Sequence, residues 1–176
     1  EIYRQGIEIF LKNPVLGDGF YFGGYEFAVS VTIRMENTRT SGGTASKTEF
    51  QLYKDANNSI KFHMFRYPTN NTLMAYDTHN GAQTEIPIRK GEFPTGTDYT
   101  YSIIALYKMG LVELWIKDNY ATNESSLFSD YTLVYSEEYD WAHCGFAFAM
   151  RQYADTTWSD WNVYYNEDFA NLYEEL

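Results

Sequence analysis

The strongest constraint on the fold is a strict alternation of apolar and polar residues in the segment 25–35. The apolar positions are Phe27, Val29, Val31, Ile33 and Met35, and polar residues occupy most positions between them. Successive side chains of a β-strand point to opposite faces of a sheet. The segment therefore predicts a strand with one face in a core.

The same alternation returns along the chain in pairs of segments separated by turn residues. Segments 50–53 and 60–65 flank the Asn-rich stretch 54–58, and segments 99–107 and 111–118 flank Lys108-Met109-Gly110. Both pairs predict antiparallel hairpins. Further strands are expected at 73–76, 85–88, 131–135, 143–152 and 158–165, which gives nine or ten short strands in all.

This pattern predicts an all-β fold, an antiparallel β-sandwich of the jelly-roll type with two sheets. An α/β fold would need helices between its strands, and the chain has almost none. Residues 1–165 are expected to form the sandwich. The acidic start of segment 166–173 favours a short C-terminal helix, although residues 166–176 fit a tail or linker equally well.

Charge and hydropathy exclude several classes of partner. The chain has 13 basic and 24 acidic residues, a formal net charge of −11, which repels nucleic acid and anionic membranes. No segment approaches the roughly 20 apolar residues that span a bilayer, so membrane insertion is not expected. Because the chain begins at Glu1, we expect it to be part of a longer, multidomain extracellular protein.

Three segments give the chain a resemblance to the concanavalin A-like superfamily of lectins, laminin-G-like domains and glucanases. They are the early strand Tyr25–Val31, the hairpin Tyr101–Asp118, and the closing pair Cys144–Phe148 with Trp158–Tyr164. The resemblance implies a jelly-roll sandwich whose final strand pairs with the first. It also implies carbohydrate binding, the commonest task of the small non-catalytic members, so that the chain resembles a carbohydrate-binding module.

The acidic residues do not reproduce the catalytic pattern of the enzymes in this superfamily. Its glucanases carry two glutamates and an aspartate alternating on one strand, but Glu113 has no carboxylate two positions away. Glu49 with Glu113 is the best pair for a hydrolase that needs one glutamate on each of two strands, and the residues around them do not match such enzymes. We therefore expect no catalytic residues, with a divergent glycoside hydrolase or polysaccharide lyase as the minority alternative.

Aromatic residues make up 19% of the chain, and aromatic rings flanked by amide and charged groups are what sugar-binding surfaces require. Strand alternation places seven such candidates on or beside one predicted concave sheet, namely Gln51, Tyr53, His63, Glu113, Trp115, Arg151 and Tyr153. Trp115 could equally pack under a loop or at a sheet edge. Trp141 and Trp158 are expected to anchor loops, and Trp161 to lie in the core.

Metal and thiol chemistry have little support in the sequence. Asp18 and Asp160 would hold a structural calcium ion if the first and last strands pair, and Asp160 could instead cap a turn. No cofactor is required. The three histidines lack metal-ligand spacing, and Cys144 in an apolar run is expected to be a core residue.

These observations lead to one expectation and two alternatives. The chain is expected to be a non-catalytic module that holds a polysaccharide by aromatic stacking and hydrogen bonds. The first alternative is a cell-surface adhesion or structural domain that binds no glycan, and the second is the enzyme already named.

Overall fold

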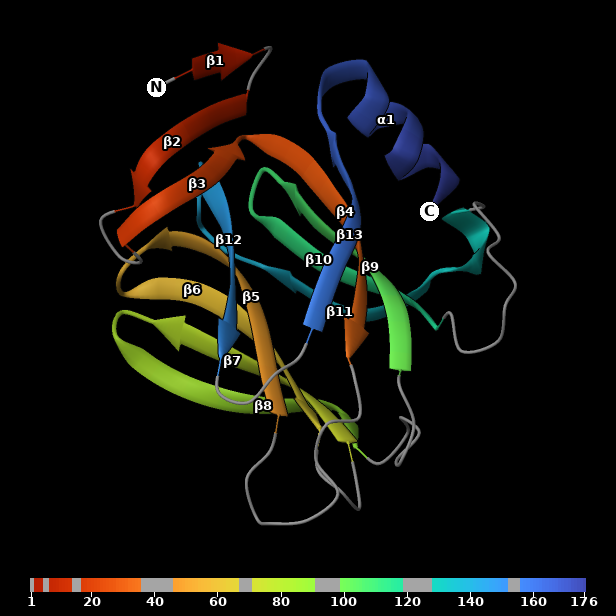
Figure 1. Ribbon diagram of the computed structural model, residues 1–176. Coiled ribbons are helices and arrows are strands. Elements are labelled where there is room, and N and C mark those ends of the chain that lie inside the picture. The colour runs from red at the N-terminus through yellow and green to blue at the C-terminus, as the bar shows by residue number, and fades with distance from the viewer. Residues whose placement is uncertain are drawn as a thin grey trace.

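The computed structural model describes the backbone of residues 2–4, 7–13, 17–35, 46–66, 71–90, 99–118, 128–151 and 156–176. Side chains are described for residues 23–34, 49–64, 73–88, 100–117, 128–148 and 157–176. The described residues form two antiparallel sheets packed face to face, with one short helix at the C-terminal end (Figure 1). This confirms the predicted antiparallel sandwich.

The larger sheet, here called sheet A, contains eight strands. Their order across the sheet is β1 (Ile2–Arg4), β2 (Ile7–Asn13), β3 (Gly17–Gly24), β12 (Cys144–Arg151), β5 (Ser46–Asp55), β6 (Asn58–Arg66), β7 (Asn71–His79) and β8 (Ala82–Lys90). The smaller sheet B has five strands, in the order β11 (Thr132–Glu138), β10 (Leu111–Asp118), β9 (Tyr99–Lys108), β4 (Glu26–Met35) and β13 (Thr156–Tyr164).

The turns that join β7 to β8 and β9 to β10 each contain two successive residues with positive φ. Asn80 and Gly81 have φ angles of 49° and 83°, and Met109 and Gly110 have 44° and 100°. Two successive residues with positive φ form the turn whose twist matches a two-residue hairpin. At Gly110 an added Cβ would lie 2.4 Å from the carbonyl oxygen of Tyr139, so only glycine fits there.

The main core fills the space between the two sheets. Alternate residues of β4, β9 and β10 meet the inward residues of β5, β6, β7 and β12, including Phe27, Ile33, Phe50, Phe62, Tyr107 and Phe146. Cys144 is completely buried in this core, as expected. The alternation in the sequence therefore identified the inner face of both sheets.

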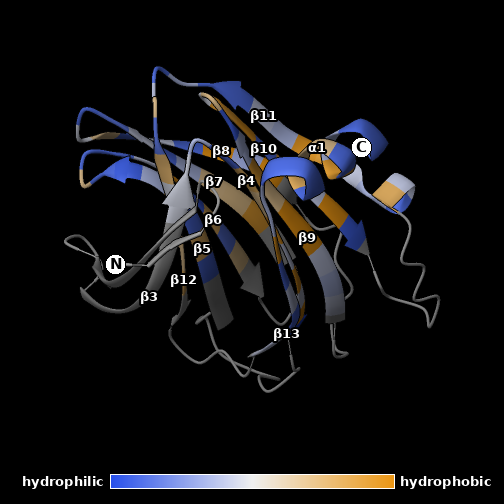
Figure 2. Cartoon of the chain, turned by 90° about the horizontal axis from the view of Figure 1, so that it is seen from above, coloured by the Kyte–Doolittle hydropathy of each residue, from blue (hydrophilic) through white to orange (hydrophobic). Residues whose placement is uncertain are grey.

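A second, smaller core lies on the outer face of sheet B, the face away from sheet A. The helix α1 (Asn166–Glu175) packs there through Phe169 and Leu172, which are 2% and 1% exposed. They contact Ala28, Ile104 and Leu106 of the sheet. Figure 2 shows hydrophobic residues on both β9 and the facing helix. Residues 166–175 are therefore helical and dock onto the sandwich.

Of two expectations about the edge of sheet B, the structure confirms one and contradicts the other. The last strand, β13, pairs with β4, the earliest strand that the sequence predicted, as expected, whereas the three strands before β4 belong to sheet A. Trp161 is 37% exposed and does not belong to the core. The cause is a bulge between Ser159 and Asn162, because it inserts an extra residue and breaks the alternation on which the prediction depended.

Within the described residues, the structure contains no helix long and apolar enough to cross a membrane.

Candidate functional site

The outer face of sheet A carries a compact block of polar side chains. The strand registers place them in three rows across β12, β5, β6, β7 and β8. The rows are Gly145-Tyr53-Ser59-Thr78-Gln83, Ala147-Gln51-Lys61-Tyr76-Glu85 and Glu49-His63-Met74-Pro87. The residues between these positions point into the main core. The alternation in the sequence therefore leaves mainly polar side chains on this outer face.

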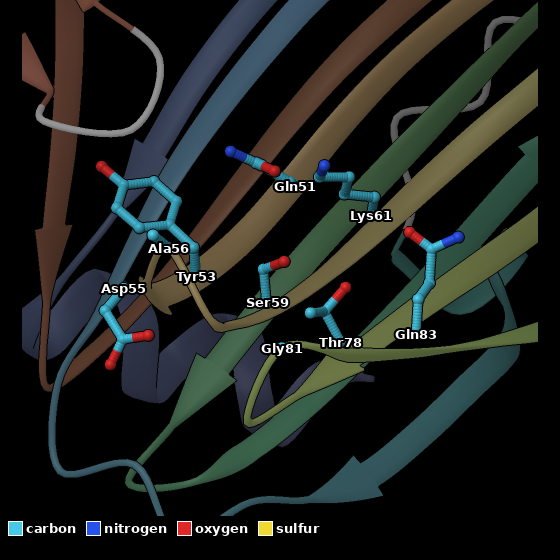
Figure 3. A pocket seen from close by; sticks show the side chains of 9 residues that line it. All are labelled: Gln51, Tyr53, Asp55, Ala56, Ser59, Lys61, Thr78, Gly81 and Gln83. Carbon is cyan, nitrogen blue, oxygen red and sulfur yellow. The ribbon is translucent and has the colours of Figure 1, made fainter.

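A pocket with a volume of about 190 Å³ opens on this face. Figure 3 shows the side chains that line it, drawn from four consecutive strands and the turns that join them. They are Gln51, Tyr53, Asp55, Ala56, Ser59, Lys61, Thr78, Gly81 and Gln83. The lining combines one aromatic ring with hydroxyl, amide, ammonium and carboxylate groups, which suits a small polar ligand.

Gly145 fixes the aromatic wall of the pocket. An added Cβ at Gly145 would lie 2.5 Å from Cζ and 2.6 Å from the hydroxyl oxygen of Tyr53. The ring of Tyr53 therefore rests directly against the backbone of β12, and the residue is only 9% exposed. The absent side chain in β12 creates the space in which this ring is held.

The β5–β6 and β7–β8 turns form one end of the pocket, and hydrogen bonds within and between these turns hold them in place. Asp55 Oδ1 accepts from the backbone N–H of Asn57 at 2.8 Å and from Asn58 Nδ2 at 2.9 Å. The Asn58 side chain, followed by the Asn57 amide, lowers the pKa of Asp55. The N–H of Gly81 donates to the carbonyl of Asn57 at 2.9 Å, so the β5–β6 turn is fastened to the β7–β8 turn.

Two potential donors in the middle row have no partner among the residues that the structure describes. Gln51 is 5% exposed, and its buried Nε2 has no hydrogen-bond partner among the residues that the structure describes. Lys61 is its cross-strand neighbour and forms no salt bridge or hydrogen bond with a described residue. A buried amide without a partner is costly in a folded protein, so both groups point to a ligand in the pocket.

Glu49 and His63 form a close pair in the adjoining row. Glu49 Oε2 lies 2.7 Å from His63 Nε2, and each residue is 7% exposed. The ring of His63 packs on that of Tyr76 with centroids 4.3 Å apart. Carboxylate, imidazole and phenol thus meet on the same face as the pocket, one row away from Gln51 and Lys61.

Only part of the predicted site is brought together by the fold. Gln51, Tyr53 and His63 lie on the outer face of sheet A, but Glu113 and Trp115 lie in β10 of sheet B. Trp115 packs against the second core beside α1, and its Nε1 donates to Glu113 Oε2 at 3.0 Å. The expectation that all these side chains line one sheet is wrong, because alternation identifies a face of a strand and not the sheet that contains it.

This separation also removes the best carboxylate pair for a hydrolase. Glu49 belongs to β5 in sheet A and Glu113 to β10 in sheet B, so they are on different sheets of the sandwich. Both residues alternate with core side chains, so each points outward from its own sheet. The two carboxylates therefore cannot flank one glycosidic bond.

The remaining predicted residues add little to this site. Arg151 ends β12, its side chain lies outside the described part, and Tyr153 lies outside the described residues altogether. Asp18 is in β3 of sheet A, whereas Asp160 is exposed in the bulge of β13 in sheet B. Although β13 pairs with β4, Asp18 belongs to β3 of the other sheet, so this pairing does not bring the two aspartates onto neighbouring strands. The described side chains contain no group of three or more metal-ligating residues.

Four lining residues were not among the predicted site residues, namely Ser59, Lys61, Thr78 and Gln83. The predicted hairpin did contain a signal for two of them. Gln51 and Tyr53 face Lys61 and Ser59 across that hairpin, and directly opposed residues share a face. Thr78 and Gln83 flank the Asn80-Gly81 turn, where only two short strands were expected.

A separate aromatic patch lies where β12 and β13 approach each other from the two sheets. Phe148 is 45% exposed, and its ring centroid lies 5.1 Å from Trp158 and 4.7 Å from Trp161. The two indoles stack with an interplanar angle of 14°. Trp158 also packs against the main core. The patch therefore both closes the side of the sandwich and leaves aromatic surface in solvent.

Comparison with known proteins supports the fold. No family model and no curated protein sequence matches the chain. A functionally unknown protein from Saccharomyces cerevisiae matches with a TM-score of 0.56 and 14% identity, over 92% of this chain and 89% of that one. An alginate lyase from Pseudomonas aeruginosa matches with a TM-score of 0.50 and 14% identity, over 87% and 77%.

A third similar structure is much longer than this chain. A GH43 protein from Bacillus licheniformis matches with a TM-score of 0.55 and 9% identity, over 79% of this chain but only 27% of its own. At such identities the likeness concerns the fold alone. The chain is thus a two-sheet β-sandwich of the jelly-roll type.

Proposed function

We propose that this chain is a non-catalytic carbohydrate-binding module, and that the pocket of about 190 Å³ on the outer face of sheet A holds the sugar. The observation that carries the proposal is the lining of this pocket. A tyrosine ring fixed against Gly145 stands beside amide, hydroxyl and ammonium groups from four neighbouring strands. Sugars present apolar ring faces and hydroxyls, and this combination matches both.

The comparisons with known structures support the proposal through the shared fold alone. The sandwich is shared with structures named as an alginate lyase and as a GH43 protein, and in the latter it corresponds to about a quarter of the chain. A domain of this size could serve as a binding module within a longer enzyme. We further propose that the parent protein is extracellular, where a charge of −11 would help to keep the module soluble.

Affinity electrophoresis against soluble glucans, xylans, mannans and pectins tests the proposal. Retardation by at least one polysaccharide is expected, and Tyr53→Ala should weaken it by about tenfold, since a buried aromatic anchor contributes about 1 to 2 kcal/mol. Tyr173→Ala is the matched control, because it removes an exposed tyrosine from α1 on the other sheet. The proposal is wrong if no polysaccharide retards the folded protein, or if both variants behave alike.

The second candidate is an enzyme, and the Glu49–His63 pair favours it. A carboxylate 2.7 Å from an imidazole can orient that imidazole for proton transfer. Incubation with the same polysaccharides should then release reducing ends or unsaturated products, and Glu49→Gln should abolish the release. Binding without any product supports the non-catalytic module.

A further inference from the structure

The pocket offers hydrogen-bond donors that have no acceptor among the described residues. Gln51 Nε2 is buried without a partner among the described residues, and the ammonium of Lys61 on the facing strand forms no ion pair there. Figure 3 shows both side chains on the same side of the sheet, next to each other at one edge of the pocket. The group that satisfies them must accept hydrogen bonds, and a negative charge would suit Lys61 best.

The anionic residue of the pocket lies at its other end. Asp55 is four residues from Gln51 along β5, roughly 13 Å at about 3.3 Å per residue. Its Oδ1 already accepts from Asn57 and Asn58. Of the two charged residues that line the pocket, Lys61 therefore lies at the end near Gln51, while Asp55 lies at the turn and is committed to holding it.

Size and net charge restrict the ligand further. Pockets for drug-sized ligands have volumes of about 300 to 1,000 Å³, so a volume of about 190 Å³ suits a smaller group, such as one terminal sugar ring. A net charge of −11 repels a long polyanion. One carboxylate on one terminal ring avoids most of that repulsion and can still reach Lys61.

We infer that the pocket recognises a sugar acid at the end of a glycan, with the carboxylate held by Lys61 and by the Gln51 amide. This inference rests on the proposed function and names the ligand class of the same site. The hydroxyls of Ser59 and Thr78, which can donate or accept, face the ring hydroxyls. Tyr53 supports the ring from the side of β12.

Matched oligosaccharides that differ only at the terminal ring test this inference. One series ends in glucose or galactose, and the other ends in glucuronic or galacturonic acid. Isothermal titration calorimetry should give the wild-type protein about tenfold or greater preference for the acid-ended series, as expected for one charge-assisted hydrogen bond. Lys61→Met should abolish this preference, because it should lower the affinity for the acid-ended series about tenfold more than the affinity for the neutral-ended series.

Lys54→Met is the control for charge alone. Lys54 is an exposed lysine of the same strand as Gln51 and does not line the pocket, so this variant changes the net charge equally and should keep the preference. Equal affinity for both series, or a preference that survives Lys61→Met, overturns the inference while the proposed function stands. Absence of binding to either series and to every polysaccharide of the electrophoresis screen overturns the proposed function as well.

Discussion

At the scale of the residue, the candidate site depends on two small residues of β12 as much as on the side chains that line the pocket. Gly145 and Ala147 of β12 face Tyr53 and Gln51 across the sheet, and their small size leaves room for both larger side chains. The ring of Tyr53 occupies the space that a side chain at 145 would need. A substitution in β12 can therefore alter the pocket without touching a lining residue.

Gly145→Ala is predicted to weaken glycan binding by about tenfold or more, because the added methyl would displace the Tyr53 ring from its place against β12. Ring displacement costs less than a backbone shift, so the fold should survive with a loss of about 1 to 2 kcal/mol in unfolding free energy. Titration calorimetry and denaturant unfolding measure the two effects. Unchanged affinity would show that the ring position does not matter.

Asp77 is predicted to make stability depend on pH. Burial raises its pKa above 3.8 despite a hydrogen bond from Tyr139, and its Oδ1 is buried without a described partner. Between 3.8 and the higher folded-state pKa, the folded protein holds a proton that the unfolded chain has lost. Stability therefore falls as pH rises through that window.

Asp77→Asn, which does not ionise, should raise the melting temperature at pH 7. The advantage over the wild-type protein should shrink towards zero as the pH approaches 4. Calorimetric melting at several pH values provides the measurement. A difference that stays constant with pH would mean that ionisation of Asp77 does not matter.

Cys144 is predicted to be inert in the native state. It is completely buried, and this burial raises the pKa of its thiol, so that little reactive thiolate forms. Labelling with an aromatic disulfide at pH 8 should be at least about a hundredfold slower than in denaturant, where the thiol behaves normally. Rapid labelling of the folded protein would contradict its position in the core.

At the scale of the element, alternation predicted most strands that follow residue 25, together with their turns. It did not predict β1, β2 and β3, which lie in segment 2–24. Gly17, Gly19, Gly23 and Gly24 interrupt the pattern within β3. An added Cβ at Gly23 would lie 2.4 Å from the carbonyl oxygen of Cys144, so tight packing against β12 favours glycine over the residues that usually signal a strand.

The helix α1 is predicted to contribute substantially to stability. Leu172 is 1% exposed between the helix and sheet B, and Leu172→Ala should lower the unfolding free energy by about 2 to 4 kcal/mol. Denaturant unfolding gives the value, with the exposed Asn171→Ala as control. Similar losses for both variants would mean that the helix does not pack as described.

At the scale of the whole molecule, the two outer faces of the sandwich differ in what covers them. The outer face of sheet B is covered by α1, with Trp115 and Glu113 beside the second core. The outer face of sheet A carries the pocket, in which Gln51 Nε2 has no partner within the described part of the chain. Gln51 and Tyr53, which line the pocket, were among the predicted site residues, but the division of the candidates between two sheets could not be predicted, since strand order is set by contacts between distant segments.

The most direct test of the central claim is to map the bound glycan by NMR. Amide signals of ¹⁵N-labelled protein are followed during titration with an oligosaccharide that binds in the electrophoresis screen. The largest shifts are expected in residues 51–61, 78–83 and 145–147, with little change in β10 and α1. Shifts concentrated around Trp115 in β10, or around Phe148, Trp158 and Trp161, would contradict the placement of the site on the outer face of sheet A.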